Sequence, residues 1–407
     1  MSDKIVIKIL TLNCWGIPYI SKDRTSRMEA IADKLASEDY GIICLQEVWS
    51  PNDFKMIKAK TQEQLPYSHY FYRLNTISML YLNGVLGSGI CVLSKYRIED
   101  VMFHKWPLNG YVHKIHHGDW FGGKGVGLCR LKIHDMNVNV YTAHLHAEYS
   151  KHNDEYLAHR VLQAFDTAQF IKMTCGGADF AILGGDLNTE PQDLAYKIIC
   201  GVAGLIDTCS NISNNLGTNE CANNSYTSSK VARLFPNGKR IDYILYLSSK
   251  LYKVEVQDFH HPFPIRVPHK EFSYSDHEAV MAALNVSPGP STQPQPTNVD
   301  VAETLKTAIN ICKTSLRIVR RQRIWYLVLA SILIVPIVWS MGLDCGIASV
   351  PVSIGLNVIR AFLTAILCYS LFMSTIWNSV ETNSLKEGCL EMEIYLKNLT
   401  EFVNIKR

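Results

Sequence analysis

The sequence contains no paired-cysteine motif. Its 12 cysteines are scattered over 407 residues, and no two of them have the Cys-x-x-Cys spacing of structural zinc sites and thiol redox centres. Small secreted domains also depend on cysteines, which they pair densely in disulfides. The scatter argues against all three classes and predicts buried, reduced cysteines in a chain that faces the cytosol.

Two further features are lacking. Residues 1–8 carry two lysines but run directly into a strand-like alternation, so we expect no signal peptide. An excess of positive charge is also lacking, because residues 1–286 contain 29 Lys and Arg against 29 Asp and Glu. Proteins that bind nucleic acids neutralise phosphates with a basic surface. We therefore expect no nucleic-acid partner.

Residues 1–286 contain no apolar run of membrane length, whereas the rest of the chain contains two. The first, residues 324–342, lacks charge and is close to the ~20 residues that span a bilayer. The second runs from about 350 to 377 and is interrupted by Asn357 and Arg360. We expect two transmembrane helices, with Arg360 paired, extended toward a membrane surface, or placed before the second span.

These features divide the chain into four expected regions. They are a globular domain (1–286), a Pro/Ser-rich linker with a basic segment (287–323), two transmembrane helices that form a hairpin (324–377) and an amphipathic helical tail (378–407). Four arginines lie between 317 and 323, directly before the first span. Because cytoplasmic segments next to membrane helices are rich in Lys and Arg, we expect a multi-pass membrane protein whose globular domain faces the cytosol. The tail is suited to lie at the interface or to mediate oligomerisation.

The first 286 residues alternate between strand and helix patterns. Helical periodicity marks three segments, with Ser26 as the expected N-cap of the first: 26–35, 154–172 and 193–199. Apolar runs typical of strands occupy eight more: 5–12, 40–45, 88–93, 126–133, 138–142, 180–183, 241–247 and 279–284. Such alternation predicts a layered α/β protein.

Polar side chains stand next to many of these strands. The short buried run 180–183 is followed by two glycines and then by Asp186 and Asn188. Taken alone, Gly-Gly-Asp also fits an ordinary turn with a local side-chain cap. Other strands bring comparable residues, namely Asn13, Glu47, His144 and His277. Since ligand sites of layered α/β folds lie at strand ends, we expect these residues to meet there.

Six short motifs, in this order, carry a family resemblance. They are Leu-Asn-Cys-Trp-Gly (12–16), Leu-Gln-Glu-Val-Trp (45–49), Thr-Ala-His-Leu-His (142–146), Gly-Gly-Asp-Leu-Asn (184–188), Arg-Ile-Asp-Tyr (240–243) and Ser-Asp-His (275–277). The ordered set resembles the endonuclease/exonuclease/phosphatase superfamily, and its aromatic variants at Trp15 and Trp49 look most like the neutral sphingomyelinase branch. The resemblance implies a DNase I-like, four-layer α/β sandwich. It also implies metal-dependent hydrolysis of a phosphate ester at a site between two sheets.

The residue types suit that chemistry. A phosphodiester anion needs a cation to balance its charge and a base to activate water. Glu47 is a hard oxygen ligand suited to Mg²⁺, and the resemblance implies that Asn13 lies beside it. His277 is the expected base, oriented by Asp276 or Asp242.

The remaining site residues are expected to act on the phosphate and the water. His144 and Asn188 would bind the phosphate, while Asp186 would orient the water or assist the metal. Asp119 and Lys124 resemble a pair that in sphingomyelinases of this branch couples a mobile loop to the active site, and they are the further expected substrate-binding residues.

The loop around Lys124 is rich in aromatic and histidine residues. Trp106, Tyr111, Trp120 and Phe121 lead to the hypothesis that the loop docks against lipid, because aromatic rings favour the headgroup region. A zinc site at His113, His116 and His117 is the less favoured interpretation, since the usual partners and spacing are lacking. A solvated surface loop is the bland alternative.

Two classes of function remain open from the sequence. The first is an integral-membrane Mg²⁺-dependent phosphodiesterase that converts sphingomyelin to ceramide and phosphocholine, or that acts on lyso-phosphocholine lipids. The second is a lipid-binding or scaffold protein of the same fold that has lost catalysis. None of the six motifs is broken, which favours the enzyme. A nuclease or soluble inositol-phosphate phosphatase is disfavoured by the balanced charge and the apolar hairpin.

Overall fold

The computed structural model describes residues 4–72, 87–114, 117–150, 153–210, 216–290, 298–343 and 349–405. The chain divides into two compact units, Met1–Thr304 and Leu305–Arg407, which are described separately. Residues 291–297 of the expected linker lie outside the described residues, as does His116. The domain boundaries expected from composition stay predictions.

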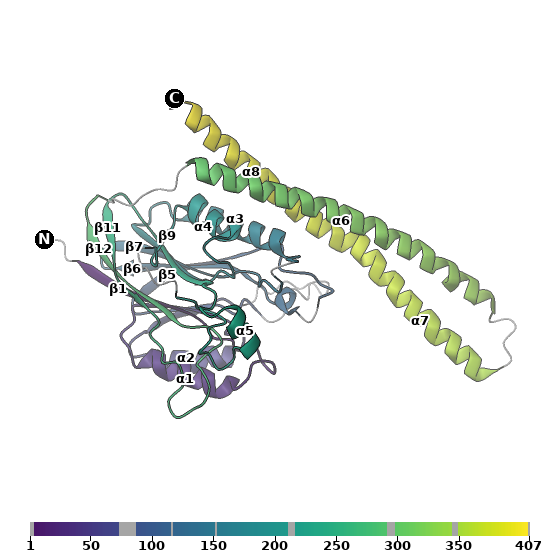
Figure 1. The fold of residues 1–407 in the computed structure, drawn as a ribbon, viewed down its shortest axis with the longest axis horizontal. Helices are drawn as coiled ribbons and strands as arrows, with labels where there is room; N and C mark the ends of the chain where they lie inside the picture. The colour runs from purple at the N-terminus through teal and green to yellow at the C-terminus, as the bar shows by residue number, and fades with distance from the viewer. Residues whose placement is uncertain are drawn as a thin grey trace. The chain divides into compact units, whose positions relative to one another are not determined.

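The first unit contains two six-stranded mixed sheets (Figure 1). The first sheet has the strand order β11 (Tyr252–His260), β12 (Val280–Pro288), β1 (Ile5–Asn13), β2 (Ile42–Gln46), β4 (Cys91–Ser94), β3 (Tyr67–Tyr70). The second has the order β5 (Arg97–Lys105), β6 (Gly125–Ile133), β7 (Met136–His144), β8 (Phe180–Asp186), β10 (Asp242–Ser248), β9 (Ile206–Asp207).

Helices cover the outer faces of both sheets. Two of them, α1 (Arg24–Ala36) and α2 (Pro51–Thr61), lie on the first sheet, and another two, α3 (Leu157–Thr174) and α4 (Leu194–Ala203), lie on the opposite side of the unit (Figure 1). A short exposed helix, α5 (Ser229–Leu234), precedes β10. The layer order is therefore helix, sheet, sheet, helix, and the expected four-layer sandwich is confirmed.

Strand β1 explains why two buried layers form. Its alternate side chains point to opposite faces, so Leu10 and Leu12 join the core under α1 and α2, while Ile7 and Ile9 join the core between the sheets. A strand buried on both faces needs an apolar residue at nearly every position, which is the pattern seen in the sequence.

The start of α1 differs from the expectation. The helix begins at Arg24 after Asp23, and Ser26 is already inside the first turn instead of capping it. The apolar face was predicted correctly, because Met28, Ile31 and Leu35 are all buried.

The second unit is built from long helices. The chain continues along α6 (Asn298–Met341), α7 (Val350–Phe372), a π-helical segment (Met373–Trp377) and α8 (Asn378–Ile405). Helix α6 forms one arm, and α7 with α8 forms the other. The two arms run antiparallel: Asn378 Nδ2 donates to Val319 O over 3.0 Å, and Lys313 Nζ pairs with Glu393 Oε1 over 2.6 Å. The π-helical turn makes α7 and α8 continuous, so α8, which lies in the expected tail 378–407, follows the second apolar helix without a break.

Two helices of the described chain, within Asp300–Met341 and Val350–Glu401, are long and apolar enough to cross a membrane. Many of their apolar side chains are exposed, including those of Trp339 and Phe362. A core helix of a soluble domain would bury such side chains, so this exposure favours contact with lipid. Arg360 is paired: its Nε donates to Ser340 Oγ over 3.0 Å on the facing arm.

Candidate active site

The strand ends of both sheets meet at one edge of the first unit. In the first sheet, Asn13 at the end of β1 stands opposite Gln46 at the end of the parallel strand β2, and Glu47 follows. In the second, His144 ends β7 opposite Asp186, which ends β8. Parallel neighbours end at the same edge of a sheet, so register places Asn13 near Glu47 in one sheet and His144 beside Asp186 in the other, and the packing of the two sheets brings the pairs together.

Antiparallel strands complete the edge from the other direction. Strand β10 starts with Asp242, which pairs with Asp186 in the ladder. His277 lies just before β12, the antiparallel neighbour of β1. Close approach of β7 and β8 requires glycine, because a Cβ at Gly185 would lie 2.1 Å from Ala143 O.

The tips themselves have unusual backbone conformations. Glu47 and Asn188 adopt positive φ angles of 54° and 44°, and Trp15 has φ 46°. Such left-handed conformations are uncommon for residues other than glycine and cluster at functional sites. Here they turn the chain sharply after each strand, so that the polar side chains face one another.

Asn13 links the two sheets. Its Nδ2 donates to Glu47 Oε1 over 3.0 Å and to Asp186 Oδ2 over 3.0 Å. One amide thus holds two carboxylates that come from different sheets. Asp186 is further fixed by the backbone N–H of Asn188, which donates to its Oδ1 over 2.9 Å.

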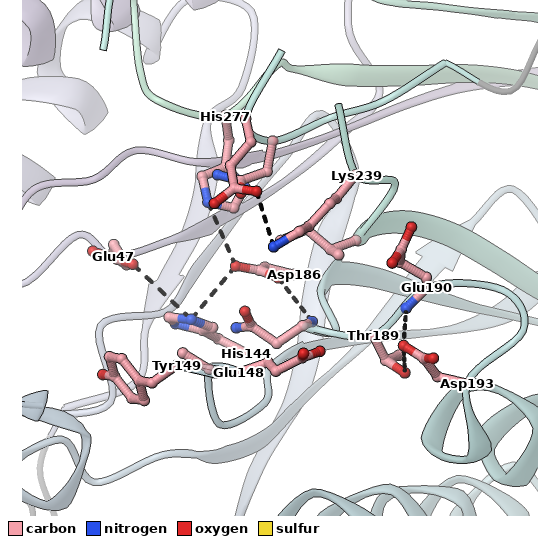
Figure 2. A pocket seen from close by; sticks show the side chains of 15 residues that line it. Glu47, His144, Glu148, Tyr149, Asp186, Thr189, Glu190, Asp193, Lys239 and His277 are labelled. Atoms are coloured by element: carbon pink, nitrogen blue, oxygen red, sulfur yellow. Dashed lines mark hydrogen bonds and ion pairs between the residues drawn. The ribbon is translucent and has the colours of Figure 1, made fainter. Parts of the chain in front are cut away.

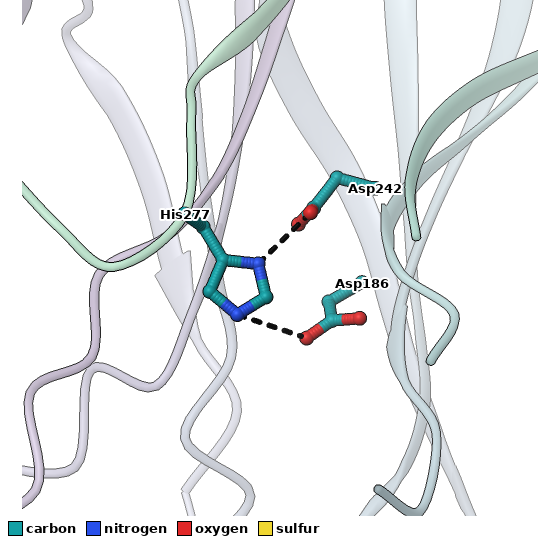
Figure 3. Close-up of side chains that lie close together, drawn as sticks. All are labelled: Asp186, Asp242 and His277. Carbon is teal, nitrogen blue, oxygen red and sulfur yellow. Dashed lines mark hydrogen bonds and ion pairs between the residues drawn. The ribbon is translucent and has the colours of Figure 1, made fainter. Parts of the chain in front are cut away.

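A histidine–carboxylate pair lies beside this link (Figure 3). His277 Nδ1 is 2.9 Å from Asp242 Oδ2, and the other ring nitrogen, Nε2, is 3.9 Å from Asp186 Oδ2. The sequence left open whether Asp276 or Asp242 orients the ring, and the structure brings Asp242 to it. Asp276 instead accepts from its neighbour, the Ser275 hydroxyl, over 3.3 Å.

Lys124 joins the site from the other side. Its Nζ lies 3.2 Å from His144 Nε2, donates to Leu145 O over 3.1 Å and forms an ion pair with Asp119. Tyr149 donates to the second oxygen of that carboxylate. Asp119 and Lys124 are therefore buried beside the site, while the coupling of a mobile loop that the resemblance implied for this pair stays a prediction.

The carboxylates of the site are crowded and buried. Burial, with the nearby Asp276, raises the pKa of Glu47; burial, with Asp242, raises the pKa of Asp186 to about 7. Burial also raises the pKa of Asp276. Several acids with raised pKa values in one cluster indicate too little positive charge around them.

The histidines respond in opposite directions. Burial lowers the pKa of His277, but Asp242 and Asp186 outweigh it and raise that pKa well above its ordinary value. Burial and Lys124 lower the pKa of His144 well below its ordinary value. At neutral pH the ring of His144 is therefore uncharged, whereas the protonation of His277 depends on the charge of the neighbouring carboxylates.

The donor set fits a hard divalent cation. Carboxylate and amide oxygens are the ligands that Mg²⁺ prefers, and added positive charge would relieve the crowded acids. Glu47 and Asn13 supply such oxygens where the acids are crowded. Asp186, Asp242 and His277 also have ligand atoms within 4.8 Å of one another. A cation bound by Asp186, Asp242 and His277 would compete with the contact between His277 and Asp242. The site formed by Glu47 and Asn13 therefore fits a metal better.

The cluster opens into a cleft of about 230 Å³ (Figure 2). Glu47, His144, Asp186 and His277 point toward one another at one end of it. The other residues that line the cleft are Ala147, Glu148, Tyr149, Asn188, Thr189, Glu190, Asp193, Asn219, Glu220, Lys239 and Ile241. Asn188 was expected from the sequence, whereas most of the others were indicated only by neighbouring motif residues.

One expectation for the loop before β6 is corrected. Trp106 and Trp120 are only 1% and 7% exposed, so these rings do not face a lipid surface. They are buried because the loop packs on the first unit; for example, Trp106 Nε1 donates to Thr167 Oγ1 over 3.2 Å. The zinc interpretation gains no support, since among the described residues the grouped metal-ligating side chains are those of the strand-end cluster.

Sequence reasoning missed the residues that tie the motifs together. Ser275 donates from Oγ to Asn13 O over 2.6 Å, which joins the first and last motifs. Thr218 Oγ1 accepts the backbone N–H groups of Ile241 and Asp242 over 3.0 and 3.1 Å. A serine or threonine in a loop carries no signal of its own, because its partner is set by the tertiary fold.

Comparisons with known proteins agree with this geometry. The model of the Endonuclease/Exonuclease/phosphatase family matches residues 10–277. A Drosophila melanogaster relative, named as a neutral sphingomyelinase, is 38% identical over 97% of this chain and 98% of its own length. Human sphingomyelin phosphodiesterase 2 is 41% identical over 70% of this chain, which covers 66% of its length.

A solved structure supports the fold. Sphingomyelinase C from Streptomyces griseocarneus superimposes with a TM-score of 0.51 over 69% of this chain and 99% of its own, at 19% identity. At that identity the likeness concerns the two-sheet architecture. The family match, by contrast, includes all the strand-end motifs from Asn13 to His277.

Proposed function

Since the chain belongs to the Endonuclease/Exonuclease/phosphatase family, we propose that it is a Mg²⁺-dependent sphingomyelin phosphodiesterase that yields ceramide and phosphocholine. The observation that carries the proposal is the intact strand-end cluster of Asn13, Glu47, His144, Asp186 and His277. Relatives with sphingomyelinase names support the choice of substrate.

His277 is the group that takes a proton. Asp242 holds its Nδ1 at 2.9 Å, so the free nitrogen, Nε2, faces Asp186 and the cleft. A water placed between Nε2 and Asp186 would be oriented by the carboxylate and would lose its proton to the ring. The neighbouring acids raise the pKa of His277, so this role requires that their charge be balanced.

Mg²⁺, held by Glu47 and Asn13, would supply that balance and the positive charge that a phosphodiester needs. Lys124 brings a second cation to the other side, where its Nζ lies 3.2 Å from His144 Nε2. His144 and Asn188 line the cleft and are placed to bind phosphoryl oxygens. Positioned donors of this kind stabilise the charge that develops as the bond to ceramide breaks.

The proposal extends to the membrane. The apolar arms of the second unit would hold the enzyme in the bilayer that contains its substrate, as a hairpin of two transmembrane helices. Arg317, Arg320, Arg321 and Arg323 precede the first apolar run, which supports a cytosolic position for the catalytic unit. Self-association through the helical arms is a further part of the proposal.

One experiment tests the substrate. Purified full-length protein in mixed micelles is incubated with Mg²⁺ and, in parallel, with sphingomyelin, a lyso-phosphocholine lipid and plasmid DNA. We expect phosphocholine release chiefly from sphingomyelin and none without divalent cation. Preferred hydrolysis of the lyso-lipid would replace the substrate, cleavage of DNA would indicate a nuclease, and inactivity on all three would indicate a binding protein.

A further inference from the structure

Arg27 is a buried charged residue that belongs to none of the six motifs and does not line the cleft. It lies on α1 among Met28, Ile31 and Leu35, and its side chain is fully buried. Burial lowers the pKa of Arg27, because removing a guanidinium ion from water is unfavourable. A buried charge persists where its hydrogen bonds are satisfied, so its partners indicate what it does.

The first partners belong to the loop that follows Asn13. Arg27 Nη1 donates to Cys14 O over 2.8 Å and Nη2 donates to Trp15 O over 2.7 Å. Its Nε donates to Lys22 O over 2.9 Å, farther along the same loop. The guanidinium therefore fixes the backbone directly after the residue that links Glu47 to Asp186.

The next partner comes from the other end of the catalytic unit. Nη1 of Arg27 also donates to Tyr274 O over 3.1 Å, and Tyr274 stands three residues before His277. In the described part of the chain, all four side-chain hydrogen bonds of Arg27 go to backbone carbonyls. The planar guanidinium thus acts as a rigid fork that joins two loops, and its partner Tyr274 is 247 residues away from Arg27 in sequence.

The positive charge of Arg27 also influences the acid cluster of the site. Its guanidinium carbon lies 4.8 Å from the ring centre of Trp15 and 5.6 Å from that of Tyr226, which cover it. Burial raises the pKa of Asp276, and the positive charges of His277 and Arg27 oppose that rise. Arg27 therefore stands behind the acid cluster as a fixed cation that does not line the cleft.

We propose that Arg27 is a positioning residue of the hydrolytic site, which holds the Asn13–Trp15 turn against the Tyr274–His277 turn. This inference rests on the proposed function. The metal-binding side of the site lies on the first turn and the base lies on the second. Their separation is fixed by the guanidinium, together with the hydrogen bond from Ser275 Oγ to Asn13 O.

Lysine cannot replace the fork. An ammonium group is a point donor on a flexible stem, whereas the planar guanidinium reaches carbonyls on both turns at once. A displacement of about 1 Å by a mutation away from the reacting atoms can lower a rate ~100-fold. Loss of the fork should therefore lower kcat while leaving substrate binding in the cleft nearly intact.

Three variants of the full-length protein test the inference. Arg27→Met removes charge and fork, and Arg27→Lys keeps the charge. Arg24→Met is the matched control, because Arg24 lies one turn earlier on α1 and contacts the first loop at Gly16 O and α2 at Asp53, but among the described residues donates no hydrogen bond to the Tyr274–His277 turn. Thermal unfolding, kcat and KM on micellar sphingomyelin, and calorimetric binding of Mg²⁺ alone are measured for each.

We expect Arg27→Lys to be folded, with kcat reduced ~100-fold, KM changed by less than about threefold and Mg²⁺ binding weakened. Arg24→Met should stay near the wild-type values. Wild-type kcat in a folded Arg27 variant, an equal loss in Arg24→Met, or failure of both Arg27 variants to fold would overturn the inference. If wild type itself is inactive on lipids but the Mg²⁺ affinities still separate as expected, the proposed function fails while the positioning role stands.

Discussion

Asp242 Oδ2 lies 2.9 Å from Nδ1 of His277, although the two residues come from different sheets of the sandwich. The contact fixes which ring nitrogen faces the cleft. It also places a buried carboxylate where it raises the pKa of the ring. Asp242 therefore influences both the orientation and the basicity of His277, so its substitution tests the pair.

Substitution of that carboxylate should change both rate and pH dependence. Burial lowers the pKa of His277 and Asp242 is the largest influence that raises it, so Asp242→Asn should lower this pKa. A base acts above its pKa, so the acidic limb of kcat/KM should move to lower pH. The maximal rate should still fall by ~10²–10⁴-fold, because the ring is no longer held.

The control for this prediction is Asp258→Asn, since Asp258 forms a similar but exposed contact with His260 over 3.0 Å. It should leave the pH–rate profile unchanged. An acidic limb that stays in place in Asp242→Asn would assign the base to another residue.

Removal of the Glu47 carboxylate should weaken metal binding. Glu47→Gln keeps the hydrogen bond from Asn13 but loses the negative charge, so the protein should stay folded. Calorimetry should detect weaker Mg²⁺ binding, and turnover at saturating lipid should be largely lost. Glu148→Gln, on the wall of the same cleft, is the control and should bind Mg²⁺ normally. Full activity of Glu47→Gln in excess chelator would refute the metal assignment.

The pair of Asp119 and Lys124 should matter for stability as well as for activity. Both side chains are buried, and burial alone would raise the pKa of Asp119, but His146, Lys124 and hydrogen bonds from Lys124 and Tyr149 lower it. Lys124→Met leaves that charge uncompensated and should cost about 3–5 kcal/mol of unfolding free energy.

The double variant Asp119→Asn/Lys124→Met removes both charges and should recover most of that loss in a denaturant melt. Additive losses in the double variant would show that the two residues act separately. Stability from Asp119 should also decline as pH falls below the ordinary pKa of an aspartate, because its pKa is lower in the folded state.

Membrane attachment should depend on the second unit. A chain that ends at Thr304 retains every strand of the first unit, so we expect it in the soluble fraction after an alkaline wash, whereas the full chain should stay in the membrane pellet. Protease added to sealed microsomes should digest the catalytic unit if that unit faces the cytosol. Protection of the unit, or a truncated chain found in the washed pellet, would contradict the proposed topology.

The central strands and their polar ends were predictable because both depend on local pattern. The buried run before Asp186 and the apolar run before Asn13 each end in a residue that breaks the pattern. Edge strands were missed, since β11 is largely exposed and mixes polar and apolar residues without a clear period. Helix α2 was missed despite a local signal: Ser50 caps it and Pro51 opens it.

The relations between motifs were not predictable from local pattern. Asp276 is adjacent to His277 in sequence, yet Asp242 is the residue that contacts the ring, because β10 and β12 bring their ends together from different sheets. The aromatic loop was misjudged for a similar reason. Tryptophan rings such as those of Trp106 and Trp120 can pack either on a lipid surface or in a protein core, and only the tertiary structure shows which environment they occupy.

The most direct test of the account is hydrolysis of sphingomyelin in ¹⁸O-labelled water with Mg²⁺, comparing full-length protein with His277→Ala. In the proposed mechanism, water activated beside His277 attacks phosphorus, so mass spectrometry should find one ¹⁸O in phosphocholine and none in ceramide. The His277→Ala variant should release almost no product in the same time. Label in the ceramide hydroxyl, or undiminished turnover by the variant, would contradict the account.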